Sequence, residues 1–263
     1  MYFGTTEVVY LFGFLLSLQM MSACSTTTES AYGNINYKKA AEVNAKMGAG
    51  YMNQGNYELA MTKLNKAIKF DDENLHANHY MGELYRRLGD MDKADEFFKR
   101  ALELNKTDPQ LLNNYGVFLC EIDKYQEAEN YFDQVLKDHL YQGKALVYEN
   151  LGLCAKYKGN LAESEKHFRR ALTMNPKLAK SLLSLAQLKF DQRNKISAYS
   201  YFQQFSKISR QSPESLWLGI LLEKERGNRS GMASYALRLK NQFPLSKEAE
   251  LLAKLELLKR KRK

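Results

Sequence analysis

Glycine recurs in the middle of this chain at an almost constant interval, and that interval constrains the fold more than any single residue does. Gly48, Gly82 and Gly116 follow one another with a period of 34, and Gly152 comes after a step of 36. A large apolar residue precedes each of the four. Such a period is typical of a repeat architecture, in which each short unit buries its apolar face against its neighbours. We therefore expect a scaffold of stacked units.

Small and large residues follow each glycine at fixed distances. A small residue comes 12 positions later, a large one 16, and a second small or branched one 19. Two antiparallel helices account for this pattern, because small side chains let helices cross closely and large ones fill the gaps. Period and pattern are those of the tetratricopeptide repeat, a pair of helices. The four sets are Ala60/Leu64/Ala67, Ala94/Phe98/Ala101, Ala128/Phe132/Val135 and Ser164/Phe168/Ala171.

Turn-forming residues support one register. Pairs such as Gly55-Asn56 suit the left-handed end of one helix and the N-cap of the next. With the glycine at position 8, six repeats result, and the last two carry Ala186 and Ile220 in its place. Two extra residues precede the fourth repeat. The repeats begin at Ala41, Leu75, Pro109, Ala145, Ala179 and Pro213.

The predicted architecture is all-α, a right-handed superhelical solenoid of about six tetratricopeptide repeats with almost no strand. Twelve helices of roughly 10–15 residues are expected. Leu245 to Leu258 carry leucine at helical spacing, which predicts a C-terminal capping helix that closes the last repeat. The solenoid and its cap are expected to occupy residues 39–258, followed by a basic tail at 259–263.

The N-terminal segment carries the pattern of an export signal. Residues 8–18 form an apolar run of 11, shorter than the roughly 20 residues of a transmembrane helix but suited to a signal-peptide core. Residues 21–24, MSAC, resemble a bacterial lipobox, in which Cys24 becomes the lipidated N-terminus after cleavage. No lysine or arginine precedes Lys38, so the usual basic n-region is missing. The alternative is a buried N-terminal helix that ends in an ordinary cysteine.

On this interpretation, residues 1–23 are a lipoprotein signal peptide and residues 24–38 a flexible polar tether. Ser25 follows the cysteine where, in the enterobacterial lipoproteins that this pattern resembles, an aspartate favours retention in the inner membrane. The expected location is the periplasmic face of the outer membrane, held by a lipid anchor.

Two cysteines remain once Cys24 is assigned to lipid. Cys120 and Cys154 are separated by a step of 34 and lie on adjacent first helices. Because of the two-residue insertion, they occupy positions 12 and 10 of their repeats. In an oxidising periplasm such a pair is able to form a disulfide that locks repeat three to repeat four. Two free, buried thiols explain the pattern equally well.

Charge and motifs argue against nucleic-acid binding and catalysis. The formal charge is +9, but five of the basic residues form the terminal run KRKRK, which is usually solvated. No P-loop, GxSxG or HExxH motif occurs. His76, His79 and Glu83 share one helix face, so a metal site there is the alternative to a polar groove surface. We predict no enzyme activity, metal, cofactor, nucleic acid or small-molecule substrate.

The concave groove is the expected functional surface. In tetratricopeptide proteins it is lined by positions 2, 5, 9, 12 and 13 of the first helices, which here mix apolar, amide and charged residues. This mixture suits an extended or helical peptide. It does not match the Lys/Asn/Asn/Lys/Arg clamp of the chaperone-binding repeats. The predicted partner-binding residues are His79, Glu83, Arg86, Arg87, Asn113, Val117 and Tyr157.

The whole chain resembles the type IV pilus biogenesis/stability lipoproteins, the PilF/PilW family. The lipobox, the short tether and six repeats carry the resemblance, and Ser234 to Pro244 (SYALRLKNQFP) is similar to that family's last repeat. The resemblance implies an outer-membrane pilotin, a non-catalytic factor that binds the secretin subunit and promotes its insertion and multimerisation. A general outer-membrane lipoprotein adaptor for other envelope proteins is the alternative, and a metal-dependent enzyme at His76, His79 and Glu83 is a third.

Overall fold

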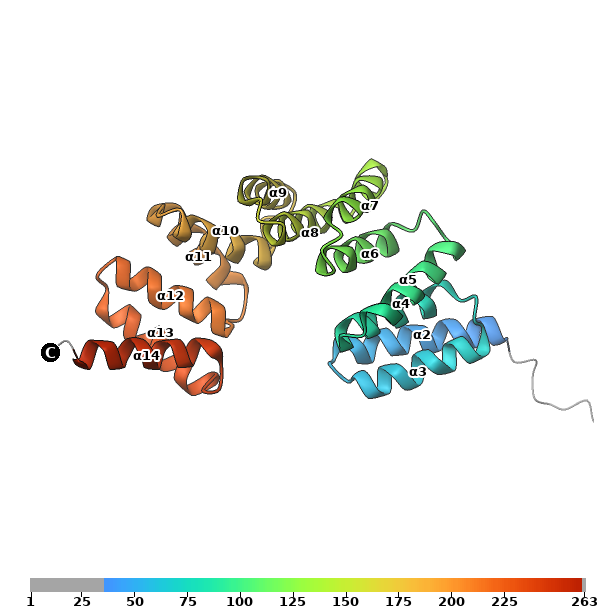
Figure 1. Ribbon diagram of the computed structural model, residues 1–263, viewed down its shortest axis with the longest axis horizontal. Helices are drawn as coiled ribbons and strands as arrows, with labels where there is room; N and C mark the ends of the chain where they lie inside the picture. Colours follow the sequence, from blue (N-terminus) through green and yellow to red (C-terminus); the bar gives the residue numbers. More distant parts are fainter. Residues whose placement is uncertain (1–35, 262–263) are drawn as a thin grey trace, which may run out of the picture.

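The computed structural model describes residues 36–261, which form helices joined by short turns. The described range holds six consecutive helix pairs, a single C-terminal helix and no strand. Figure 1 shows the pairs stacked into an open arc. The helices are α2 (Tyr37–Asn53), α3 (Tyr57–Phe70), α4 (Leu75–Leu88), α5 (Met91–Leu104), α6 (Pro109–Glu121), α7 (Tyr125–Lys137), α8 (Lys144–Tyr157), α9 (Leu161–Met174), α10 (Ala179–Asp191), α11 (Lys195–Ile208), α12 (Pro213–Glu225), α13 (Arg229–Gln242) and α14 (Lys247–Lys261).

This architecture confirms the predicted all-α solenoid of six tetratricopeptide repeats with a terminal helix. Four first helices begin at the predicted repeat starts, whereas α2 begins four residues before Ala41 and α8 one residue before Ala145. The last helix, α14, buries Ala249 and Leu252 in a core cluster with Leu216 of α12. The single helix therefore covers the apolar end of repeat six.

The repeated glycines mark the points where the two helices of a repeat cross most closely. A Cβ atom added to Gly82 would lie 3.0 Å from Cγ of Phe98, and one added to Gly116 would lie 2.8 Å from Cε1 of Phe132. Both phenylalanines are fully buried. The constant spacing in the sequence thus joins each glycine to the large side chain that packs against it.

Repeat six keeps this contact one residue earlier than predicted. The register places Ile220 at the glycine position, but a Cβ added to Gly219 would lie 2.9 Å from Cδ1 of Tyr235. Tyr235 follows Gly219 at the same spacing that separates Phe98 from Gly82. The repeat therefore retains the crossing, shifted by one position.

The turn inside each repeat needs one residue in the left-handed region. Glycine takes that place in four repeats, with φ between 71° and 82°. Asp123 and Arg193 take it in repeats three and five, each with φ 61°. A left-handed conformation is strained for a residue with a Cβ, and more so for arginine than for aspartate.

The insertion before repeat four lengthens one connection and brings two cysteines together. Six residues separate α7 from α8, against four between α5 and α6. Cys120 of α6 and Cys154 of α8 are buried and joined by a disulfide, with their Cα atoms 5.5 Å apart. The bond ties repeat three to repeat four.

We expect this disulfide to stabilise the solenoid. Closing a loop of about 35 residues restricts the unfolded chain and is worth roughly 3–4 kcal/mol in the chain-entropy model. Replacing both cysteines by alanine should lower the free energy of unfolding by about that amount, measured by guanidinium denaturation. Equal stability of the oxidised parent and the double variant, or two alkylatable thiols in protein exported to an oxidising compartment, would contradict the prediction.

Candidate functional site

At the top of the arc the first helices α6 and α8 lie on the inner side and the second helices α7 and α9 on the outer side (Figure 1). The sequence pattern predicts a surface groove on the inner side. Three of its predicted residues are buried instead, since the exposed fractions of His79, Glu83 and Asn113 are 2%, 8% and 9%. The prediction that these side chains are free for a partner is wrong.

Hydrogen bonds from one repeat to the next explain this burial. At the same position of successive first helices, His79, Asn113 and Glu149 each contact the following first helix. We call these contacts the inter-repeat ladder. Its members are His79 Nε2 with Asn114 Nδ2 at 3.0 Å, Asn150 Nδ2 donating to Asn113 Oδ1 at 3.0 Å, and Ser181 Oγ donating to Glu149 Oε2 at 2.7 Å.

An ion-pair cluster around the buried Glu83 adds to the ladder between repeats one, two and three. Glu83 accepts hydrogen bonds from Arg86 and Arg87, each at 2.8 Å, and Arg86 also pairs with Glu121 of α6. Arg87 donates to the backbone oxygen of Met52 in α2 at 3.4 Å. Burial raises the pKa of Glu83, but its hydrogen bonds and ion pairs with the two arginines outweigh this and leave the pKa lowered.

The three groups considered as metal ligands each have another partner. His76 Nδ1 lies 2.9 Å from a carboxylate oxygen of Glu42, and Glu83 is held by arginines. Burial lowers the pKa of His79 to about 4, so its ring is neutral at pH 7 and its Nε2 accepts from Asn114. In the described part of the chain, His, Cys, Asp and Glu form no cluster arranged to bind a metal.

The remaining predicted groove residues differ in access. Arg86 is largely enclosed by its ion pairs and Val117 is half-buried. Arg87 is more exposed than Arg86, and Tyr157, at the end of α8, is 59% exposed. Of the seven predicted residues, only Arg87 and Tyr157 are exposed.

An accessible apolar surface lies on the inner side of repeats four to six. Leu146 and Tyr157 of α8 are exposed, and α10 and α12 carry partly exposed leucine, phenylalanine and tryptophan at other positions of the same inner face. In repeats five and six, Leu183 and Trp217 stand at the ladder position in place of a buried polar residue. We call this surface the C-terminal groove, formed by Leu146, Leu153, Tyr157, Leu183, Phe190, Trp217 and Leu221.

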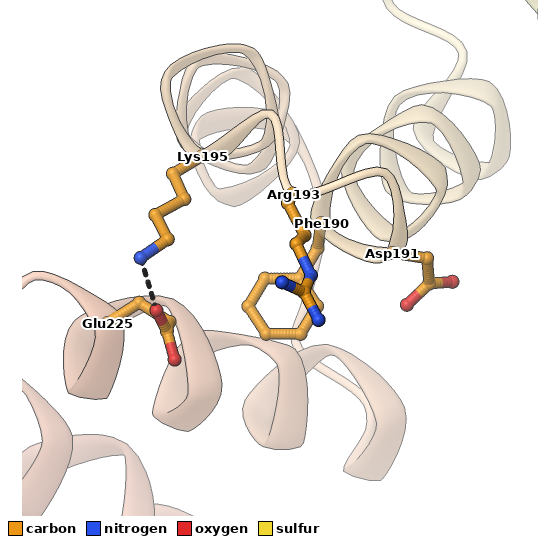
Figure 2. A pocket seen from close by; sticks show the side chains of 5 residues that line it. All are labelled: Phe190, Asp191, Arg193, Lys195 and Glu225. Carbon is orange, nitrogen blue, oxygen red and sulfur yellow. Dashed lines mark ion pairs between the residues drawn. The ribbon is translucent and has the colours of Figure 1, made fainter.

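Two hollows lie at the edge of the C-terminal groove. The larger, of about 480 Å³, is lined by Phe190, Asp191, Arg193, Lys195 and Glu225 (Figure 2). The smaller, of about 150 Å³, lies between repeats four and five and includes Lys156, Gln187 and Asp191. Prediction from the sequence missed Trp217, Leu221 and the turn residue Arg193. Trp217 and Leu221 occupy the same positions in repeat six as Leu183 and Gln187 in repeat five, so the repeat register could have identified them.

Known proteins resemble this chain over most of its length. The sequence matches the tetratricopeptide repeat family over residues 75–108 and 107–177. The type IV pilus assembly protein PilF of Pseudomonas aeruginosa is 32% identical over 210 residues, covering 80% of this chain and 83% of the relative. The similarity therefore extends well beyond the two family matches.

Solved structures give the same result. The structure of P. aeruginosa PilF has a TM-score of 0.70 with 32% identity and covers 83% of this chain and 99% of its own. The crystal structure of PilW, a widely conserved type IV pilus biogenesis factor, has a TM-score of 0.70 with 28% identity and covers 81% of this chain and 98% of its own.

The ion pairs of Glu83 predict a pH-dependent contribution to stability. A carboxylate with a lowered pKa in the folded state stabilises the fold above its ordinary pKa of 4.5, and this contribution is lost as the pH falls below that value. Glu83→Gln should therefore cost about 2 kcal/mol at pH 7, with the difference from the parent narrowing towards pH 3. Chemical denaturation between pH 3 and 7 measures it, with the exposed Glu103→Gln as control. A difference that is the same at every pH would exclude this role.

Proposed function

The chain belongs to the PilF family of type IV pilus assembly proteins, and on that premise we propose that it is a non-catalytic pilotin. In this proposal the solenoid binds the secretin subunit of the pilus machinery and promotes its insertion and multimerisation in the outer membrane. The proposal depends on the extent of the similarity to P. aeruginosa PilF. The sequence similarity covers 83% of that protein, and the structural similarity covers 99% of its solved structure.

The inner surface of the solenoid supports a binding role. Apolar side chains of the C-terminal groove offer area to bury, and the charged and amide groups beside them offer directional hydrogen bonds to a peptide. The inter-repeat ladder joins the first helices of repeats two to five, so the part of this surface formed by repeats four and five is preorganised and binding there costs little ordering entropy.

A lipid anchor at Cys24 is the second part of the proposal. Cys24 lies outside the described residues, and within them no helix is long and apolar enough to cross a membrane. The anchor would hold the solenoid on the periplasmic face of the outer membrane and raise the local concentration of the secretin subunits it binds.

Cys24→Ala should abolish incorporation of labelled fatty acid and leave the protein unprocessed or in the soluble periplasmic fraction. Ser25→Ala, next to it in the sequence, should keep the label. Labelling followed by membrane fractionation measures both. Undiminished labelling of the Cys24→Ala protein would refute the anchor.

Deletion of the protein should lower the ratio of heat-stable secretin multimer to monomer in outer-membrane fractions, and expression of the full chain should restore it. The general adaptor alternative predicts a normal ratio and the loss of a different envelope complex. A normal ratio in the deletion strain would therefore reject the pilotin function in favour of the adaptor.

A further inference from the structure

The two hollows at the edge of the C-terminal groove are neighbours along the solenoid. Asp191, the last residue of α10, lines both of them. The smaller hollow contacts the end of α8 through Lys156, and the larger contacts the end of α12 through Glu225. A chain segment that follows the solenoid axis is therefore able to place one side chain in each hollow.

Unpaired cations line these hollows at Lys156 and Arg193, and two more, Lys180 and Lys224, lie elsewhere on α10 and α12. Lys156, Lys180, Arg193 and Lys224 form no ion pair or side-chain hydrogen bond among the described residues, and all four are exposed. The nearby anions are mostly occupied, since Glu225 pairs with Lys195 at 2.5 Å (Figure 2) and Asp191 accepts from Gln187 at 2.8 Å. Asp191 and Glu214, at the end of α10 and the start of α12, are acids of this described surface that form no ion pair.

The N-terminal repeats show the opposite balance. There the inner arginines Arg86 and Arg87 are engaged by Glu83, and Arg86 also by Glu121. Their charge is already neutralised within the fold. The free positive charge on the inner side of the arc thus lies at repeats four to six.

Arg193 occupies a backbone position that ordinarily favours glycine. Its φ of 61° matches the turn glycines of four other repeats, and its side chain lies in the larger hollow beside Phe190. The Arg193 side chain forms no ion pair or hydrogen bond among the described residues, and backbone strain at such a residue is typical of a functional position.

From these observations we propose that the C-terminal groove binds an acidic, apolar peptide segment, with large apolar side chains against Leu183, Phe190 and Trp217 and carboxylates at Arg193 and Lys156. The proposal rests on the binding role proposed above and adds the chemistry and place of the site. Charge complementarity and concave shape decide the occupant. A flat bilayer surface is unable to follow the inner side of an arc, whereas a peptide strand or helix does so.

Arg193→Gly and Lys156→Gln test the site without risk to the fold. Glycine relieves the strained turn, so any loss of binding by Arg193→Gly reflects the missing guanidinium. Asp123→Gly makes the same backbone change in repeat three and is the matched control. Lys177→Gln, in the turn before α10, controls for loss of an exposed charge.

The probes are fluorescein-labelled 16-residue peptides that tile the secretin from the same organism, and a phage-displayed library of 12-residue peptides. Binding is measured by fluorescence anisotropy at low and moderate salt. We expect bound peptides to be rich in aspartate or glutamate and large apolar residues. The double variant Arg193→Gly with Lys156→Gln should bind these peptides at least tenfold more weakly than the parent protein. The two control variants should lose less than twofold in affinity. Asp→Asn or Glu→Gln changes in the peptide should weaken its binding to the parent protein by as much as the double variant does.

Each outcome has a defined meaning. Loss of secretin-peptide binding in the double variant supports both the site and the secretin as partner. Selection of acidic apolar library peptides that need Arg193, with no secretin peptide bound, supports the site and rejects the partner. Secretin peptides that bind the double variant as tightly as the parent overturn the site while the proposed function stands. Binding of anionic phosphatidylglycerol vesicles that depends on Arg193 overturns the peptide assignment.

Discussion

The close crossing of the two helices in each repeat is the contact on which the rest of the structure depends. A glycine on the first helix lets a large side chain from the second lie directly against the helix backbone. The close approach of the two helices buries the large side chains completely, namely Leu64, Phe98, Phe132 and Phe168. Because the same contact recurs from unit to unit, each repeat presents nearly the same shape to the next, and stacking them produces an arc instead of a globule. Repeat six shows how strong the requirement is, since its glycine moves by one residue and a tyrosine moves with it.

Stacking of the repeats uses polar groups that would otherwise be free for a partner. In the N-terminal half, the side chains of His79, Asn113 and Glu83 are buried and hydrogen-bonded, because an unpaired polar group at such a place would cost stability. In repeats five and six, leucine, phenylalanine and tryptophan of the first helices are partly exposed instead, and cations such as Arg193 and Lys224 stay in solvent. One solenoid therefore has two kinds of inner surface, one engaged in holding the repeats together and one accessible.

The sequence predicts the repeat period, the helix pairs and four of the six starts because these depend on local spacing and turn chemistry. It fails at the groove, where position within a repeat says which way a side chain points but not whether the next repeat covers it. The partners of His79, Asn113 and Arg86 lie 35, 37 and 35 residues further on, so a search for polar pairs about one period apart would have found the ladder. Arg193 is missed for another reason, since a left-handed turn without glycine leaves no compositional signal.

The disulfide between the first helices of repeats three and four has a mechanical consequence. A solenoid held at one end and loaded at the other carries tension through its stacked helices, and its units separate one after another. Cys120 and Cys154 close the chain between them into a loop that does not extend while the bond is intact. The fully stretched chain is shorter by about 120 Å as a result. Force then bypasses the second helix of repeat three and passes directly from α6 to α8, so the centre of the arc is a short inextensible link between two extensible arms.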